Sequence, residues 1–126
     1  MSQSSDSDSP ASCLVIVLSR ASLEAPQAAF LALRYAATAA ALDVAVELHA
    51  VSSGAARLFA RGQADAALLA QIRQATEQGA SILVCPVALA EQGLRAEDLI
   101  DEVHGVRGAA SLLETGLAPG ARFLSF

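Results

Sequence analysis

Residues 81–94, SILVCPVALAEQGL, read as a strand, a turn and a helix that closes at Gly93. The apolar run Ile82–Val84 is typical of a parallel-sheet strand that is buried on both faces. Pro86 suits the first position of a helix, because the N–H that proline lacks has no partner there, and Cys85 then becomes the N-cap residue. We therefore expect Cys85 at the carboxyl edge of a parallel sheet, where open α/β sheets place their reaction sites.

Three other stretches read as strands. Cys13–Leu18 is a second apolar run with three consecutive β-branched residues, and it predicts another central strand. Val44–Val51 alternates apolar and polar residues, with Glu47 and His49 on one face, which is typical of an edge strand that keeps that face in water. Arg122–Ser125 follows a Pro-Gly turn and is the last expected strand.

Helical segments separate these strands, and this alternation predicts a parallel sheet with right-handed crossovers. We expect an α/β fold with a small, open and mostly parallel sheet of four or five strands, helices on both faces, and a strand order that begins 2-1-3. In that order Leu14–Leu18 lies beside Ile82–Val84, and Val44–Ala50 forms an edge. The pattern leaves open whether residues 103–107 add a very short strand. The expected helices are 26–42, a short one carrying Leu58 and Phe59, 64–78, one that opens at Pro86, 95–103 and 109–114.

The composition limits the class of protein. The 126 residues are enough for one domain, which we place at residues 12–126, and the serine- and aspartate-rich residues 1–11 are expected to form a disordered tail. Apolar runs are far shorter than the roughly 20 residues that a membrane helix needs. A net charge of −5, the lack of lysine and eight scattered arginines argue against nucleic acid or membrane partners. Without a recognisable secretory signal, we expect a cytoplasmic location with both cysteines reduced.

Cys85 is the candidate reactive residue. As an N-cap residue, its sulfur would lie near free backbone N–H groups and the positive end of a helix dipole, which favour the nucleophilic thiolate over the thiol. The alternative is a packed, inert side chain, because cysteine often behaves as a small buried hydrophobe. Cys13 is expected about 15 Å from Cys85, at the opposite end of a parallel strand, so we predict that it is dispensable and forms no disulfide with Cys85.

Other candidate groups carry weaker signals. The sequence has no glycine-rich nucleotide loop, no G-x-S-x-G motif and no paired cysteine or histidine spacing, so we expect neither a cofactor nor a metal. His49 is either a proton partner of Cys85 or, as we favour, a surface imidazole at a strand end. His104 is expected to interact with a helix C-terminus. The Ser52-Ser53-Gly54 stretch is interpreted as a helix cap rather than an anion site.

Several motifs taken together resemble the DsrE/DsrF/DsrH and TusBCD sulfur-relay family over residues 14–126. They occur in the family's order and spacing. They are the apolar first strand, ALRYA at 32–36, ILVCPVAL at 82–89, Gly93-Leu94 and EDLI at 97–100.

The resemblance implies a sulfurtransferase role. In the family, a cysteine at the end of the matching strand accepts sulfane sulfur as a persulfide and passes it to a small carrier such as TusA or DsrC; the matching residue here is Cys85. The resemblance also implies a homo-oligomer, a trimer or a hexamer, and it identifies no general base. Some members lack the cysteine and serve as structural subunits, so a regulatory or assembly subunit with a packed Cys85 is the alternative function.

Overall fold

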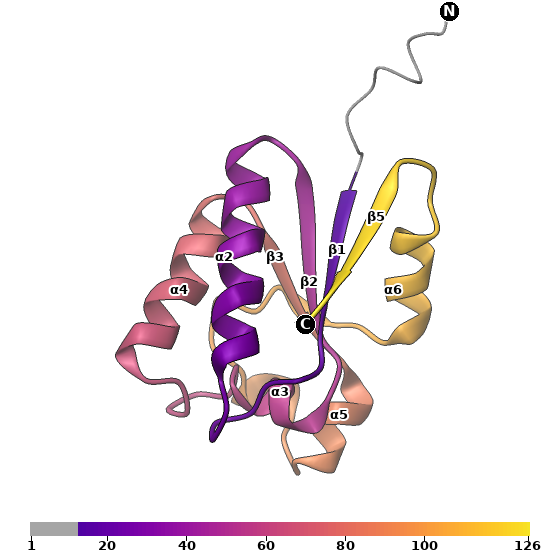
Figure 1. Cartoon of the computed structure of the whole chain (residues 1–126). Coiled ribbons are helices and arrows are strands. Elements are labelled where there is room, and N and C mark those ends of the chain that lie inside the picture. Colours follow the sequence, from indigo (N-terminus) through magenta and orange to yellow (C-terminus); the bar gives the residue numbers. More distant parts are fainter. Residues whose placement is uncertain (1–12) are drawn as a thin grey trace, which may run out of the picture.

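Five parallel strands form one open sheet in the computed structural model, which describes residues 13–126 (Figure 1). This confirms the predicted fold class. The expected tail, residues 1–11, lies outside the described residues. The sheet has the order β4-β3-β2-β1-β5. The strands are β1 Cys13–Leu18, β2 Ala45–Ala50, β3 Ser81–Val84, β4 Gly105–Val106 and β5 Ala121–Ser125.

The predicted order beginning 2-1-3 is wrong, because β2 lies between β1 and β3. It pairs with β1 along its whole length and with β3 from Glu47 onward. The alternation in β2 suggested a wet face, but its two polar side chains bond to each other: His49 Nε2 lies 2.9 Å from Glu47 Oε1. His49 is only 1% exposed. Polar groups that satisfy each other can lie on a covered face, so the alternation did not mark an edge strand.

Helices lie on both faces of the sheet (Figure 1). Helices α2 and α4 pack side by side against one face, α6 packs on β1 and β5 from the other, and α3 and α5 lie together at the carboxyl edge. Within residues 13–126, no helix is long and apolar enough to span a membrane. The helices are α2 Gln27–Ala41, α3 Ser53–Arg57, α4 Ala66–Glu77, α5 Pro86–Glu91 and α6 Ala109–Gly116, and Ala96–Asp98 forms a 3₁₀ turn.

The prediction of a helix over residues 95–103 is wrong, because only the 3₁₀ turn Ala96–Asp98 forms there. Leu99 is extended and forms an isolated antiparallel bridge with Ala60, and the Ile100 N–H donates to the Phe59 carbonyl at 3.0 Å. These contacts draw the segment toward the end of α3 before it turns into β4. The very short strand left open for residues 103–107 is therefore present as β4.

Local sequence signals explain where two of the helices begin. The Ser52 hydroxyl accepts a hydrogen bond from the Ala55 N–H at 3.1 Å and caps α3, as the cap interpretation of this stretch predicted. The Asp65 carboxylate accepts from the Leu68 N–H at 2.8 Å and caps α4. Gly54 is required by close packing, since a Cβ atom there would lie 2.8 Å from the Ala21 carbonyl oxygen.

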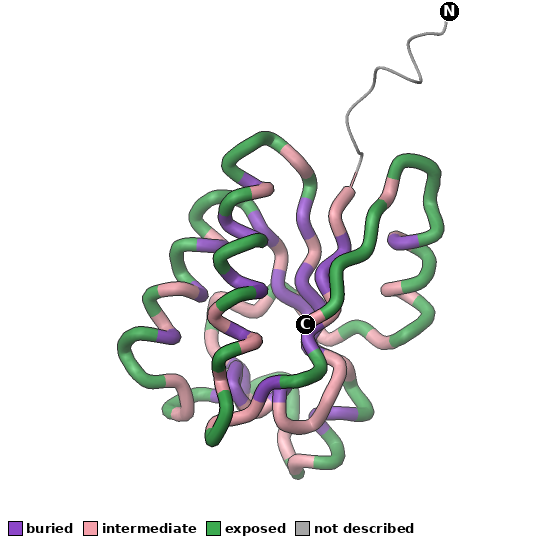
Figure 2. Tube along the Cα trace, in the orientation of Figure 1, coloured by how far each residue is buried: buried purple, intermediate pink, exposed green. Residues whose placement is uncertain are grey.

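The main core lies between the sheet and the pair α2–α4, and Figure 2 shows how burial is concentrated in the central strands. Small alanines on the inner side of α2 let this helix approach β1 and β2 closely. Each fully buried leucine or isoleucine contributes about 1.5–3 kcal/mol of transfer free energy. In contrast, most of β5 is exposed. The largest fully buried side chains include Phe59, Ile16, Leu18, Leu33, Leu48, Ile72 and Ile82.

Candidate functional site

Cys85 lies where the sequence predicted it, directly after β3 and at the N-cap of α5. Its backbone is extended, with φ −69° and ψ 129°, and Pro86 opens the helix. The Cys85 N–H donates to the Ala50 carbonyl at 3.0 Å, and its carbonyl accepts from the Leu89 N–H at 3.0 Å. The backbone of Cys85 is thus held by the end of β2 and by the first turn of α5. The side chain is half-buried and carries a free thiol.

The chain that leaves β4 runs beside the segment that holds Cys85. Val84 pairs with Val106, and the Arg107 N–H donates to the Val84 carbonyl at 3.0 Å. A Cβ atom on Gly108 would lie 3.7 Å from the ring of Pro86. Cys85 and Arg107 therefore occupy equivalent positions, one residue beyond the last paired residues of β3 and β4. This proximity could not be predicted from the sequence, because β4 has only two residues.

His49 lies on the face of the sheet opposite α2, two residues before the level of Cys85. It is in register with Leu83, and its Nε2 atom is engaged by Glu47. The favoured interpretation of a surface imidazole is wrong, because the ring is buried. Within the described part of the chain, no hydrogen bond joins His49 to Cys85. The structure therefore brings His49 together with Glu47 and not with the candidate nucleophile.

His104 bonds to β3 and not, as predicted, to a helix C-terminus. Its Nδ1 atom accepts a hydrogen bond from the Ile82 N–H at 3.0 Å, and its own N–H donates to the Ile82 carbonyl at 2.8 Å. The expected partner, a helix C-terminus, does not exist there because the 3₁₀ turn ends at Asp98. His104 instead completes the backbone pairing of β3 just before β4 begins.

Cys13 lies at the start of β1, at the opposite edge of the sheet and separated from β3 by β2. Burial and, to a smaller extent, the negative charge of Glu47 raise the pKa of the Cys13 thiol above its ordinary value. Both cysteines are free in this structure. Among residues 13–126, no group of three or more His, Cys, Asp or Glu side chains is placed to hold a metal ion.

The model of the DsrE/DsrF-like family matches residues 14–126. The chain belongs to this family. The match confirms the resemblance seen in the sequence, and it spans every strand and the segment around Cys85.

Two solved structures share the fold of this DsrE/DsrF-like chain. The YchN protein from E. coli superposes with a TM-score of 0.76 at 22% identity, over 90% of this chain and 97% of that one. A protein of unknown function from Methanobacterium thermoautotrophicum, MTH1491, gives a TM-score of 0.69 at 18% identity, over 90% of this chain and 98% of that one. At such identities the likeness concerns the fold alone. No curated protein matches the chain.

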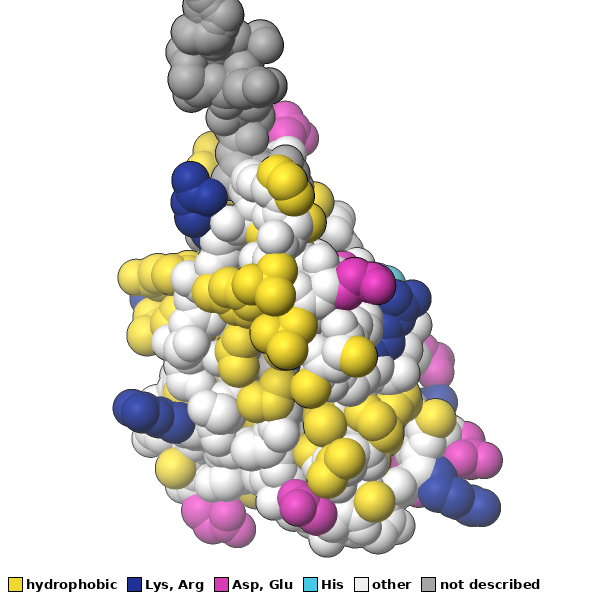
Figure 3. All heavy atoms as spheres, turned by 90° about the vertical axis from the view of Figure 1, so that its right-hand side faces the viewer, with side chains coloured by type: hydrophobic (Ala, Val, Ile, Leu, Met, Phe, Trp, Pro, Cys, Tyr) yellow, Lys and Arg dark blue, Asp and Glu magenta, His cyan; other side chains and the backbone are white. Residues whose placement is uncertain are grey.

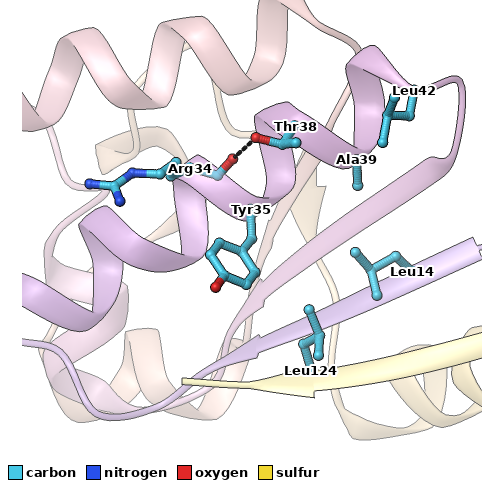
Figure 4. Close-up of a pocket in the computed structure, with 7 residues that line it drawn as sticks. All are labelled: Leu14, Arg34, Tyr35, Thr38, Ala39, Leu42 and Leu124. Atoms are coloured by element: carbon cyan, nitrogen blue, oxygen red, sulfur yellow. Dashed lines mark hydrogen bonds between the residues drawn. The ribbon is translucent and has the colours of Figure 1, made fainter.

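One groove of this DsrE/DsrF-like chain lies away from Cys85. It has a volume of about 280 Å³, lies between α2 and the strands β1 and β5, and is lined mainly by apolar side chains such as Leu14, Leu42 and Leu124 (Figure 4). The Thr38 hydroxyl, one of the polar groups that line it, already donates to the Arg34 carbonyl at 2.8 Å. No set of polar groups converges in this groove, so it does not resemble a catalytic pocket.

Proposed function

We propose that this chain is a sulfur-relay protein, a sulfurtransferase that accepts sulfane sulfur as a persulfide on Cys85 and transfers it to a small carrier protein. The observation that carries the proposal is the position of a free cysteine at the carboxyl edge of the sheet, between the end of β3 and Pro86, in a chain of the DsrE/DsrF-like family. The first N–H groups of α5 lack partners within the helix and lie next to Cys85, an arrangement that suits a negatively charged sulfur.

The reaction needs no external oxidant or reductant. The Cys85 thiolate attacks the outer sulfur of a donor persulfide, R–S–SH, so that a new S–S bond forms, the donor S–S bond breaks, and R–S⁻ leaves. The product is Cys85–S–SH. A carrier thiolate, R′–S⁻, then attacks the outer sulfur of Cys85–S–SH, takes it as R′–S–SH, and releases the Cys85 thiolate. Atoms and charge balance in both steps.

The surface near Cys85 suits the approach of another protein's thiol. Cys85 is half-buried, but Pro86 is exposed and Val87, in the first turn of α5, is 65% exposed. An exposed apolar side chain this close to a reacting sulfur supports the docking of a protein segment, because contact there removes apolar surface from water. We assign this role to a sulfur carrier of the TusA or DsrC type, and we place the reaction in the cytoplasm, where free thiols persist.

Self-association as a trimer or hexamer is part of the same proposal. Leu113 of α6, Leu117 directly after α6 and Phe123 of β5 are 48%, 74% and 41% exposed. Figure 3 faces this side of the molecule and shows hydrophobic side chains gathered on it. We call these three residues the β5–α6 surface. Among the strands of residues 13–126, none pairs with the outer edge of β5, and an open strand edge of this kind supports pairing with another copy.

A transfer assay tests the proposal. The protein is loaded with polysulfide, freed of excess donor and mixed with a single-cysteine carrier of the TusA type, and the mass of the carrier is followed. The wild type should pass one sulfur atom to the carrier, Cys85→Ser should pass none, and Cys13→Ser should behave as the wild type. A folded wild type that neither loads nor transfers would favour the assembly-subunit alternative, which the packing of Cys85 against core residues also supports.

A further inference from the structure

We propose that Arg107 makes Cys85 selective for sulfur donors that carry a negative charge, such as polysulfide anions and persulfides whose R group is anionic. The proposal rests on the proposed function, because it names the class of donor that Cys85 accepts and the residue that recognises it. In this proposal the permanently charged guanidinium of Arg107 extends from the adjacent strand segment toward the Cys85 sulfur. There it binds the negative charge of the donor.

The backbone geometry places the two residues side by side. Cys85 and Arg107 each follow the paired residues Val84 and Val106, and adjacent strands are about 4.8 Å apart. The two segments stay close beyond the sheet, since the Arg107 N–H still bonds to the Val84 carbonyl and Gly108 lies against Pro86. Arg107 is thus on the strand segment adjacent to Cys85, on the side away from β2.

The charge of Arg107 is available to a ligand. Its side chain is exposed, and among residues 13–126 the arginines in ion pairs are Arg61, Arg73 and Arg95, with Arg57 bound to Gln92. No hydrogen bond or ion pair within the described residues uses the Arg107 side chain. Arginine stays protonated at all relevant pH values, so its charge must be balanced by solvent ions or by a bound anion.

A positive group near Cys85 would assist the proposed reaction by stabilising negative charge. A donor that carries a negative charge is repelled by the Cys85 thiolate, and R–S⁻ leaves with a negative charge after the S–S bond breaks. A positive group at the sulfur offsets the repulsion during approach and the charge on the departing sulfur. A single charge at this distance and near the surface changes such rates by about threefold to tenfold.

The test compares two disulfide probes that differ in charge. In a Cys13→Ser background, the Cys85 thiolate attacks either anionic 5,5′-dithiobis(2-nitrobenzoate) or neutral 4,4′-dithiodipyridine, forms a mixed disulfide and releases one aryl thiolate. The measured quantity is the ratio of the anionic to the neutral rate constant. The neutral probe corrects for changes in thiolate fraction and in access, which affect both rates.

The matched variants are Arg107→Gln and Arg20→Gln. Arg20 is exposed at the same carboxyl edge but follows β1, two strand positions or about 10 Å from Cys85, so its loss changes the net charge equally. We expect Arg107→Gln to lower the rate ratio about threefold to tenfold, Arg20→Gln to leave it nearly unchanged, and Arg107→Lys to retain most of it. The effect of Arg107→Gln should shrink at high salt.

Two results would overturn the inference: a ratio that Arg107→Gln leaves unchanged, or one that Arg20→Gln lowers as much. Both variants alter exposed side chains, so each should fold, and thermal unfolding checks this. The outcome is separate from that of the proposed function. If the wild type loads and transfers sulfur but Arg107→Gln does not change the ratio of rate constants, the proposed function stands and the role of Arg107 is refuted. If Arg107→Gln lowers the ratio but the wild type transfers no sulfur, Arg107 selects anionic probes and the proposed function is refuted.

Discussion

At the scale of single residues, Cys13 and Cys85 carry the same thiol group but lie in different environments. Burial and Glu47 raise the pKa of Cys13, so less of it is thiolate near neutral pH. Cys85 is the N-cap residue of α5 and lies beside the exposed Pro86 and Val87. We predict that iodoacetamide at pH 7.5 modifies Cys85 at least about tenfold faster than Cys13 in the folded protein. Because the pKa of Cys13 is raised, its alkylation should accelerate only at a pH higher than an ordinary cysteine thiol requires.

Peptide mapping during the reaction measures both rates in one sample. Cys85→Ser should leave only the slow modification, and Cys13→Ser only the fast one. Faster labelling of Cys13 than of Cys85 in the native protein would show that the assignment of the reactive thiol is wrong.

The hydrogen bond between buried His49 and half-buried Glu47 is the second residue-scale feature, and sequence reasoning did not predict it. Replacing Glu47 with alanine removes the partner of a buried imidazole, so the free energy of unfolding should fall by about 1–3 kcal/mol in urea titrations. Glu47→Gln keeps an oxygen acceptor in place and should cost less.

The same pair allows a direct test of the proton-partner hypothesis for His49. Because His49 bonds to Glu47, His49→Ala should be less stable but still load sulfur on Cys85 wherever it remains folded. Loss of sulfur loading in a folded His49→Ala protein would identify His49 as a partner of the nucleophile.

At the scale of elements, side-chain caps set the starts of helices. Asp65→Ala removes the acceptor of the Leu68 N–H, and we expect the protein to lose about 1 kcal/mol of stability in thermal or urea unfolding. Asp65→Asn retains a capping oxygen and is the matched control. Equal losses in the two variants would argue that the charge of Asp65, rather than its cap bond, stabilises α4.

Element positions were more predictable than their spatial order. The apolar runs of β1 and β3 and the Cys85-Pro86 boundary follow from local patterns, because burial and proline chemistry act over a few residues. The central place of β2 depended on Glu47 and His49 satisfying each other, a contact that alternation alone does not reveal. The proximity of Arg107 to Cys85 depended on β4, whose two residues are too short for a periodic signal.

At the scale of the whole molecule, the β5–α6 surface should mediate self-association. Leu117→Glu places a charge on its most exposed residue, so we expect smaller assemblies by light scattering at micromolar concentration, with the fold intact because the side chain is already in water. Leu42→Glu, at a leucine that is 73% exposed beyond the end of α2, is the matched control and should leave the assembly unchanged. A monomeric wild type would refute self-association itself.

The most direct test of the central claim is to locate the sulfur. The wild-type protein is incubated with polysulfide, blocked with an alkylating agent, digested and analysed by mass spectrometry, with and without reductant. The account predicts one additional sulfur atom on the peptide that contains Cys85, lost on reduction, and none on the Cys13 peptide. A persulfide on Cys13 alone, or no adduct under conditions that load a known relay protein, would contradict the assignment of Cys85 as the sulfur carrier.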